Sequence, residues 1–198
     1  ELLGAKQHGH IAAVGFDLYC RVLAQAVREL KGEAPEMITS EEAIAYLTPL
    51  TQGVQINLPL AVHLPEDYVP DEALRLQLYR RLAGLFNEED IAAMAQELED
   101  RFGELPEAAT NLLYQLKLKA LALESGVQAI TVDSGQIVIK AEGLEELDRA
   151  GLQRRVGPNI RVSRRQIWMP LHPNPALWQA ELEKVLRLMH RMLYDPGG

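Results

Sequence analysis

Cysteine is almost absent from this chain, which holds a single one, Cys20, among 198 residues. A lone thiol cannot form an internal disulfide, and it cannot supply a multi-thiolate metal site. Cys20 falls on the apolar stripe of an expected helix, a position typical of a buried structural thiol rather than of a nucleophile. We therefore expect no function that depends on cysteine chemistry.

Long apolar runs are also missing, because charged residues interrupt every hydrophobic stretch within a few positions. This pattern argues against a signal peptide and against a transmembrane helix. Hydrophobic residues still make up 47% of the chain, and a domain near this size buries roughly 70% of its unfolded surface. We expect a cytoplasmic protein with a substantial core and no membrane contact.

The common catalytic motifs are absent as well. The sequence contains no GxxxxGK[ST] loop, HExxH, CxxC or GxSxG string, which excludes the usual phosphate cradles, zinc sites and nucleophile elbows. His8 and His10 could meet a metal from an extended segment, but no third ligand lies near them in the sequence. We expect no catalytic residue, no metal site and no cofactor.

The charges that are present are segregated by sign. The chain carries 20 Lys and Arg against 28 Asp and Glu, a net charge of −8, which disfavours duplex DNA on average. Residues 149–165 nevertheless hold arginines at 149, 154, 155, 161, 164 and 165 and no acid, whereas residues 88–107 hold eight acids and only Arg101 as a base. Such segregation can steer docking onto a charged partner.

The N-terminal part predicts a separate helix. Apolar residues recur at three- and four-residue spacing from Val14 to Lys31, and Gly32 ends the pattern. Residues 33–53 carry two prolines, four glutamates and Gly53, which is typical of a connector. We divide the chain into residues 1–33, a linker at 34–53 and a main domain at 54–198.

The main domain begins with alternating polar and apolar residues at 54–58, which predict a strand that Pro59 ends. Asp71 can cap a helix whose apolar face runs from Leu74 to Leu85, and Asn87 can cap a helix that ends before Gly103. A third helix is expected from Pro106 to about residue 125.

The pattern then changes to short strands. Residues 127–132 and 137–139 predict a hairpin around a turn at 133–136, and residues 143–150 predict a short helix. Residues 160–162 and 167–169 predict either one bent strand or a tight pair, and Asn174 can cap a terminal helix over 175–194. The sum is an α+β fold, with several helices packed on a small mixed or antiparallel sheet.

A family resemblance rests on ELLGAKQHG at residues 1–9 and on QELEDRFGELP at residues 96–106, with VQINLP at 54–59, LPEDYVPD at 64–71 and RLQLYRRL at 75–82 between them. In this order the strings resemble the C-terminal part of the transcription-repair coupling factor (Mfd) family. The first string also resembles the translocation motif of RecG-type helicases, of which Gln7 would be a remnant.

The resemblance implies a non-catalytic regulatory domain of an ATP-dependent translocase that moves on duplex DNA. In the family this domain docks on an N-terminal UvrB-like module and masks the surface that recruits UvrA, until RNA polymerase engagement and ATP-driven remodelling release it. Carried over by motif, the docking residues would be Glu97, Asp100 and Arg101. Glu97 and Asp100 would need basic partners from outside this chain, and Arg101 could pair with a carboxylate.

Spacing alone allows a simpler interpretation of the same segment. Leu98 and Phe102 lie four residues apart and should face the core, so Glu97, Asp100 and Arg101 fall on other sides of the helix. They could be no more than charged surface residues near a helix end.

Two further alternatives remain open. The first is a nucleic-acid-binding accessory domain that uses Arg154, Arg155, Arg161, Arg164 and Arg165. Against it, residues 149–165 contain no aromatic side chain for base stacking, and the following Trp168 is expected in the core. The second is a docking surface for RNA polymerase or another protein on the leucine-rich helices.

Overall fold

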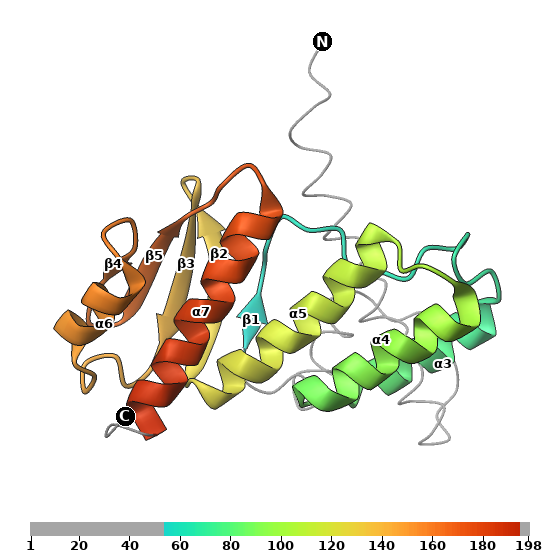
Figure 1. Cartoon of the computed structure of the whole chain (residues 1–198), viewed down its shortest axis with the longest axis horizontal. Helices are drawn as coiled ribbons and strands as arrows, with labels where there is room; N and C mark the ends of the chain where they lie inside the picture. The colour runs from blue at the N-terminus through green and yellow to red at the C-terminus, as the bar shows by residue number, and fades with distance from the viewer. Residues whose placement is uncertain (1–53, 195–198) are drawn as a thin grey trace, which may run out of the picture. The chain divides into compact units, whose positions relative to one another are not determined.

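The computed structural model of this chain describes residues 54–194 (Figure 1). The predictions for Gln7, for Cys20, for the helix at 14–31 and for the boundaries at 33 and 53 lie outside the described residues. Within them the chain forms two compact units, Pro59–Lys117 and residues 54–58 together with 118–194. Each unit is described by itself.

The first unit contains α3 (Glu72–Ala83), α4 (Glu88–Phe102) and the beginning of α5 (Glu107–Glu124). Both predicted N-caps are confirmed, since Asp71 accepts a hydrogen bond from the Leu74 amide at 2.9 Å and Asn87 accepts one from the Asp90 amide at 2.8 Å. Each cap satisfies a backbone donor that has no partner inside its helix.

The end of α3 comes earlier than predicted. The helix stops at Ala83, and Gly84 caps it through bonds from its amide to the carbonyls of Arg81 and Leu82, so that Leu85 lies beyond the helix. The segment before α3 contributes apolar side chains to the core, and the amide of Leu64 donates to the Tyr79 hydroxyl at 2.7 Å. The core of this unit comprises Leu60, Val62, Leu64, Val69, Leu78, Leu82, Ile91, Met94, Leu98, Ala109, Leu112 and Leu113.

The second unit is built on a five-stranded sheet in the order β1-β2-β3-β5-β4. The strands are β1 (Gln55–Ile56), β2 (Val127–Asp133), β3 (Gln136–Ala141), β4 (Arg161–Val162) and β5 (Gln166–Pro170). β1 pairs with β2 in parallel and all other pairs are antiparallel. The predicted mixed sheet and α+β class are confirmed.

The predicted β2–β3 hairpin is also confirmed. Its turn places Ser134 at φ 50° and Gly135 at φ 74°, the left-handed pair that a tight hairpin turn requires. The segments around residues 161 and 167 form a tight antiparallel pair rather than one bent strand. β1 is shorter than the predicted strand at 54–58, although the Asn57 amide still donates to the Ile130 carbonyl at 2.8 Å.

The prediction of a helix at residues 143–150 is wrong. The helix that forms is α6 (Arg149–Val156), which begins where the predicted one was expected to end. Gly143 has φ +76°, outside the right-handed helical region, and the Asp148 side chain accepts a hydrogen bond from the Gly151 amide at 2.9 Å. The acidic cap therefore starts the helix after the turn, and the arginines that follow become helical.

One face of the sheet is covered by α7 (Pro175–Tyr194), as Figure 1 shows. The buried strand residues Ile130, Ile139 and Ile167 are aligned with one another across β2, β3 and β5. α7 buries Trp178, Leu182, Val185, Leu186 and Met189. The Ser125 hydroxyl, just after α5, donates to the carbonyls of Leu121 and Leu186, which connects this end of α5 to α7.

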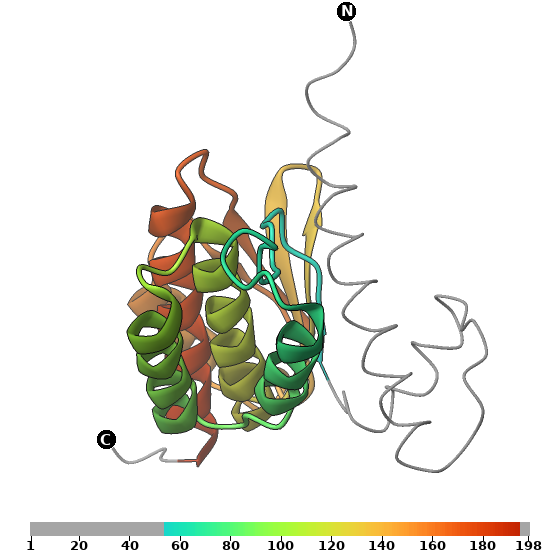
Figure 2. The same ribbon diagram turned by 90° about the vertical axis from the view of Figure 1, so that its right-hand side faces the viewer.

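Figure 2 shows α3, α4 and α5 side by side. Across residues 54–194, no helix combines the length and the apolarity that crossing a membrane would demand.

Candidate interaction sites at the end of α4 and beside the β4–β5 turn

The end of α4 has the two-sided character that its spacing predicts. Leu98 is fully buried and Phe102 is half-buried, whereas Asp100 and Arg101 are exposed and Glu97 is partly exposed. The apolar residues hold the helix on the core, so the charged residues are presented outward on a supported helix. This arrangement is compatible both with docking and with an ordinary charged surface.

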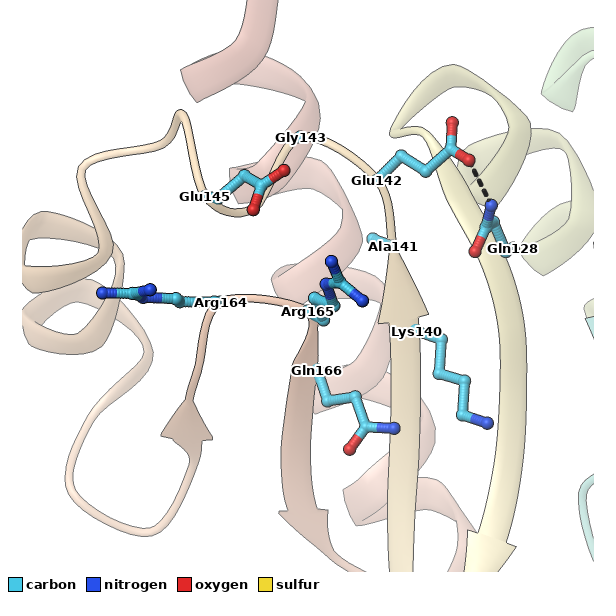
Figure 3. Close-up of a pocket in the computed structure, with 9 residues that line it drawn as sticks. All are labelled: Gln128, Lys140, Ala141, Glu142, Gly143, Glu145, Arg164, Arg165 and Gln166. Carbon is cyan, nitrogen blue, oxygen red and sulfur yellow. Dashed lines mark hydrogen bonds between the residues drawn. The ribbon is translucent and has the colours of Figure 1, made fainter.

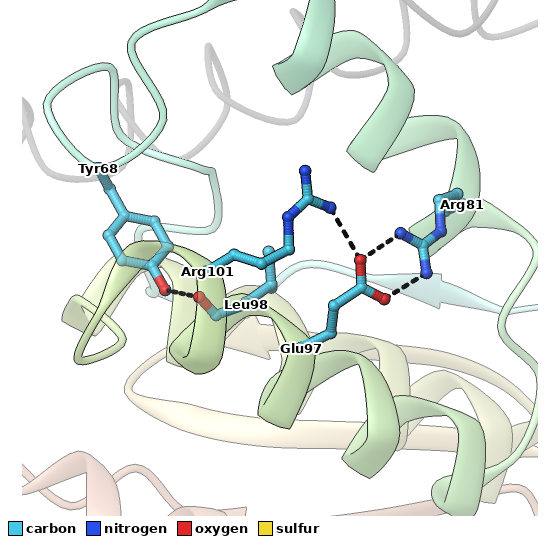
Figure 4. Close-up of polar contacts among 5 residues, drawn as sticks. All are labelled: Tyr68, Arg81, Glu97, Leu98 and Arg101. Atoms are coloured by element: carbon cyan, nitrogen blue, oxygen red, sulfur yellow. Dashed lines mark hydrogen bonds and ion pairs between the residues drawn. The ribbon is translucent and has the colours of Figure 1, made fainter.

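Glu97 is held by two arginines of its own chain. Its two carboxylate oxygens accept hydrogen bonds from the Arg81 guanidinium of α3 at 2.6 and 2.5 Å, and one of them also accepts from Arg101 at 2.9 Å (Figure 4). These bonds, that from Arg81 first, lower the pKa of Glu97 to about 2. The expectation that Glu97 lacks a basic partner within this chain is therefore wrong, because α3 packs beside α4 and supplies one.

Asp100 has a weaker partner. The side-chain amide of Gln96, four residues earlier, donates to its carboxylate at 2.9 Å. This is an amide rather than a cation, and Asp100 is exposed. Its charge therefore remains available to a basic group of a partner.

The last turn of α4 is fixed from the side by Tyr68. The Tyr68 hydroxyl lies 3.0 Å from the carbonyl oxygens of both Leu98 and Gly103 and donates to them, and its ring meets Phe102 edge-on at 5.7 Å. Burial, followed by the nearby Glu99 carboxylate, raises the pKa of this hydroxyl. These contacts attach the last turn of α4 to the segment that precedes α3.

Gly103 and Arg101 complete this helix end. Gly103 has φ 89° and ψ −166°, a conformation that is essentially restricted to glycine. The Arg101 guanidinium lies over the Phe102 ring, 5.1 Å from its centroid, while it also bonds Glu97. The DRFG string thus specifies a rigid helix end as well as exposed charges. A shallow depression of about 340 Å³ lies beside this network and is lined by Arg81, Leu85, Asp90, Ala93, Met94 and Glu97.

The arginines of residues 149–165 are distributed over α6, β4 and the β4–β5 turn. Arg154 and Arg155 lie in the last turn of α6, and Arg154 approaches Asp148 at 3.8 Å. Arg161 on β4 stacks over the Trp168 ring, 4.2 Å from its centroid. Trp168 is half-buried, so its expected place in the core is wrong; it alternates with the buried Ile167 and Met169 on β5 and points to the other face of the sheet.

Arg164 and Arg165 lie in the β4–β5 turn and line a depression of about 540 Å³. Lys140, at the end of β3, joins them, although it lies outside the basic segment of the sequence. Its pairing with Gln166 in the β3–β5 register brings it there, and only knowledge of that register could have found it. The lining residues are Gln128, Lys140, Ala141, Glu142, Gly143, Glu145, Arg164, Arg165 and Gln166 (Figure 3).

Among residues 54–194, no three His, Cys, Asp or Glu side chains gather in a way that could hold an ion. His8 and His10 lie outside this range.

Comparison with known proteins decides the family. The TRCF domain family matches residues 58–152, which include α3, α4 and the whole DRFG helix end. The chain belongs to the transcription-repair-coupling factor family.

Curated members of the family support this assignment. The chain is 37% identical over 144 residues to the transcription-repair-coupling factor of Mycobacterium bovis, covering 70% of this chain and 11% of that protein. It is 32% identical over 161 residues to the factor of Staphylococcus epidermidis, covering 80% of this chain and 13% of that protein. The chain thus spans a small part of the length of these relatives.

A solved structure supports the fold. The crystal structure of the C-terminal domain of a transcription-repair coupling factor superposes with a TM-score of 0.61, over 70% of this chain and 94% of that domain, at 18% identity. The α+β architecture of residues 54–194 is therefore that of the family's C-terminal domain.

Proposed function

We propose that this domain is a regulatory docking domain of a transcription-repair coupling factor. Its end of α4 docks on the N-terminal UvrB-like module and masks the surface that recruits UvrA, as the family resemblance implies. The observation that supports this most is the network of Arg81, Glu97 and Arg101, because it holds charged groups in fixed positions on a rigid helix end.

The network is organised before any partner arrives. Glu97 bonds both arginines, and Tyr68 and Gly103 fix the turn that follows. A partner therefore does not have to order these side chains, which reduces the entropic cost of docking. Preorganised charge of this kind favours one geometry of association over others.

Arg81 extends the docking surface beyond the motif. The four side chains of Arg81, Glu97, Asp100 and Arg101 carry two positive and two negative charges, so their sum is zero. A partner surface of one strong sign would gain little, whereas one with alternating signs could pair with each in turn. We infer that the docking partner presents at least one carboxylate, for Arg101, and one cation, for Asp100.

The energy required of such a contact is small. Holding a tethered pair closed for 99% of the time needs about 2.7 kcal/mol. Exposed ion pairs contribute about 0.2–1 kcal/mol each and better-desolvated pairs more. A few contacts aided by tethering within one polypeptide are therefore enough.

The first experiment removes the charges in the full-length factor. We expect Glu97→Ala/Asp100→Ala/Arg101→Ala to increase UvrA affinity roughly tenfold to a hundredfold. Each loss of about 1.4 kcal/mol of docking free energy raises the ratio of undocked to docked domain tenfold. The affinity is measured as binding of each variant to UvrA immobilised on a sensor surface. Circular dichroism checks that each variant is folded.

A matched variant controls for net charge. Asp133→Ala/Glu146→Ala/Arg191→Ala removes the same two acids and one arginine at exposed positions of the second unit. We expect no change in UvrA affinity from it. Unchanged affinity in a folded α4 triple variant would overturn the proposal.

A second experiment separates docking from the masking of UvrA. The 198-residue chain is titrated against the separately expressed UvrB-like module by calorimetry. We expect binding that Arg101→Ala weakens. Absence of binding, together with increased UvrA affinity in the triple variant, would show that α4 regulates the factor by a route other than this docking.

A further inference from the structure

The depression beside the β4–β5 turn is not used by the proposed docking function. It brings together Lys140, Arg164 and Arg165 from two strand ends that are far apart in the sequence. Within residues 54–194 none of these three side chains makes a hydrogen bond or an ion pair. Unpartnered cations that line one depression of an acidic chain favour the binding of an anionic ligand.

We propose that this depression, together with Trp168, binds a single strand of nucleic acid through its phosphate backbone. Lys140, Arg164 and Arg165 would contact successive phosphates, and a base would stack on Trp168 in place of the Arg161 guanidinium, which lies over its ring in the structure. This activity is independent of the docking of α4.

The directions of the side chains favour a strand over a single phosphate. In Figure 3 the Arg165 guanidinium turns toward the loop that carries Gly143, whereas Arg164 extends away from it, and Lys140 lies on the far side of Gln166 from Arg164. One phosphate would need these donors to converge on it. Cations spread along a depression instead match the repeated charges of a polynucleotide backbone.

The neighbouring residues on the sheet favour nucleic acid over an acidic peptide. Gln166 pairs with Lys140 and Trp168 pairs with Arg161, and alternation along β5 puts all four on one face of the sheet. An indole beside basic side chains is typical of surfaces that bind single strands, where unstacked bases lie on aromatic rings. An acidic peptide has no group that needs the indole.

Two acidic residues, Glu142 and Glu145, also line the depression. Glu142 accepts a hydrogen bond from the Gln128 side chain at 2.5 Å, which gives its carboxylate a partner. Glu145 also lines the depression, opposite Arg165 in Figure 3, and its charge opposes a phosphate. We therefore expect Glu145→Gln to strengthen binding about threefold and Glu146→Gln, which is exposed outside the depression, to leave it unchanged.

The test titrates the 198-residue chain against a fluorescein-labelled oligothymidylate of roughly 16 nucleotides, a length within known single-strand site sizes. Anisotropy is followed from about 50 to 200 mM salt. We expect binding at low salt that weakens as salt rises. A duplex of the same length should bind more weakly, because its bases cannot stack on Trp168.

Charge removal should change the salt dependence in a defined way. Arg164→Ala/Arg165→Ala should weaken binding about tenfold or more and reduce the slope of log K against log salt by roughly 1.4, at about 0.7 for each lost phosphate contact. Arg154→Ala/Arg155→Ala removes the same charge from α6 outside the depression and should have a much smaller effect.

Tryptophan emission provides an independent signal. Trp178 is 2% exposed, so quenching on binding should report Trp168, and it should disappear in Trp168→Phe. Three outcomes would overturn the proposal: no binding at the lowest salt, equal losses from the two arginine pairs, or a polyglutamate that binds as tightly as the oligonucleotide.

Discussion

The end of α4 and the depression beside the β4–β5 turn both contain arginines, but these differ in their bonding partners. In the α4 network Arg81 and Arg101 both bond Glu97. In the depression, Arg164 and Arg165 have no side-chain partner among residues 54–194. The arginines of one surface are bonded to a carboxylate of the chain, whereas those of the other are not.

The difference indicates what each surface can recognise. Guanidinium groups fixed by a carboxylate offer defined directions to a folded partner, at the cost of weaker attraction over distance. Unpaired guanidinium groups attract any polyanion and adapt to it, but order themselves only on binding. The rigid network therefore suits the proposed protein docking, and the adaptable depression suits the proposed binding of a flexible strand.

The largest loss of stability should come from Gly103→Ala, at the rigid end of α4. Gly103 has φ 89° and ψ −166°, so a Cβ strains the end of α4 by about 1–3 kcal/mol although no atom lies within 4 Å of it. Urea unfolding should show this loss. Gly84→Ala, at φ −87° with ordinary contact at 3.5 Å, should be neutral or stabilising. Equal effects of the two substitutions would mean that a Cβ at Gly103 does not strain the end of α4.

Removing the Tyr68 hydroxyl should have the next largest effect. Tyr68→Phe leaves the carbonyls of Leu98 and Gly103 without this donor and should cost about 1 kcal/mol in urea unfolding. Amide exchange should accelerate in the last turn of α4. Tyr194→Phe, 68% exposed, is the control and should change neither quantity.

A smaller change in stability is expected from Arg81→Met, because the ion pair is partly exposed and contributes less than about 1 kcal/mol. The pKa of Glu97 should rise from about 2 toward its ordinary value of 4.5, as an NMR titration of its carboxyl carbon can show. The pair contributes its stability in full above pH 4.5 and loses it as pH falls through about 2. The difference in unfolding free energy between wild type and variant should therefore shrink as pH falls from 4.5 to about 2. A pH-independent difference would contradict the role given to this ion pair.

The smallest effect on stability should come from Arg164→Ala/Arg165→Ala. Both side chains are exposed and make no side-chain bond within residues 54–194, so unfolding free energy should change by less than about 0.5 kcal/mol. A larger loss in urea unfolding would mean that these arginines support the fold, and the contrast with the α4 network would fail.

Local signals account for much of what could be predicted from the sequence. The caps at Asp71 and Asn87 and the turn at Ser134 and Gly135 depend on a few neighbouring residues, and the structure confirms them. The misplaced helix at residues 143–150 also has a local origin. The cap at Asp148 is visible in the sequence, and it marks the start of the helix that forms.

By itself the sequence determined the α+β class, most element positions and the family, because these depend on periodicity, capping and motif strings. Only the tertiary structure decided which charges meet. Arg81 and Glu97 are 16 residues apart and pair because α3 and α4 are neighbours. Lys140 reaches Gln166 and the two turn arginines through the β3–β5 register. Periodicity specifies which side of an element a residue occupies, whereas packing and register determine what lies opposite it.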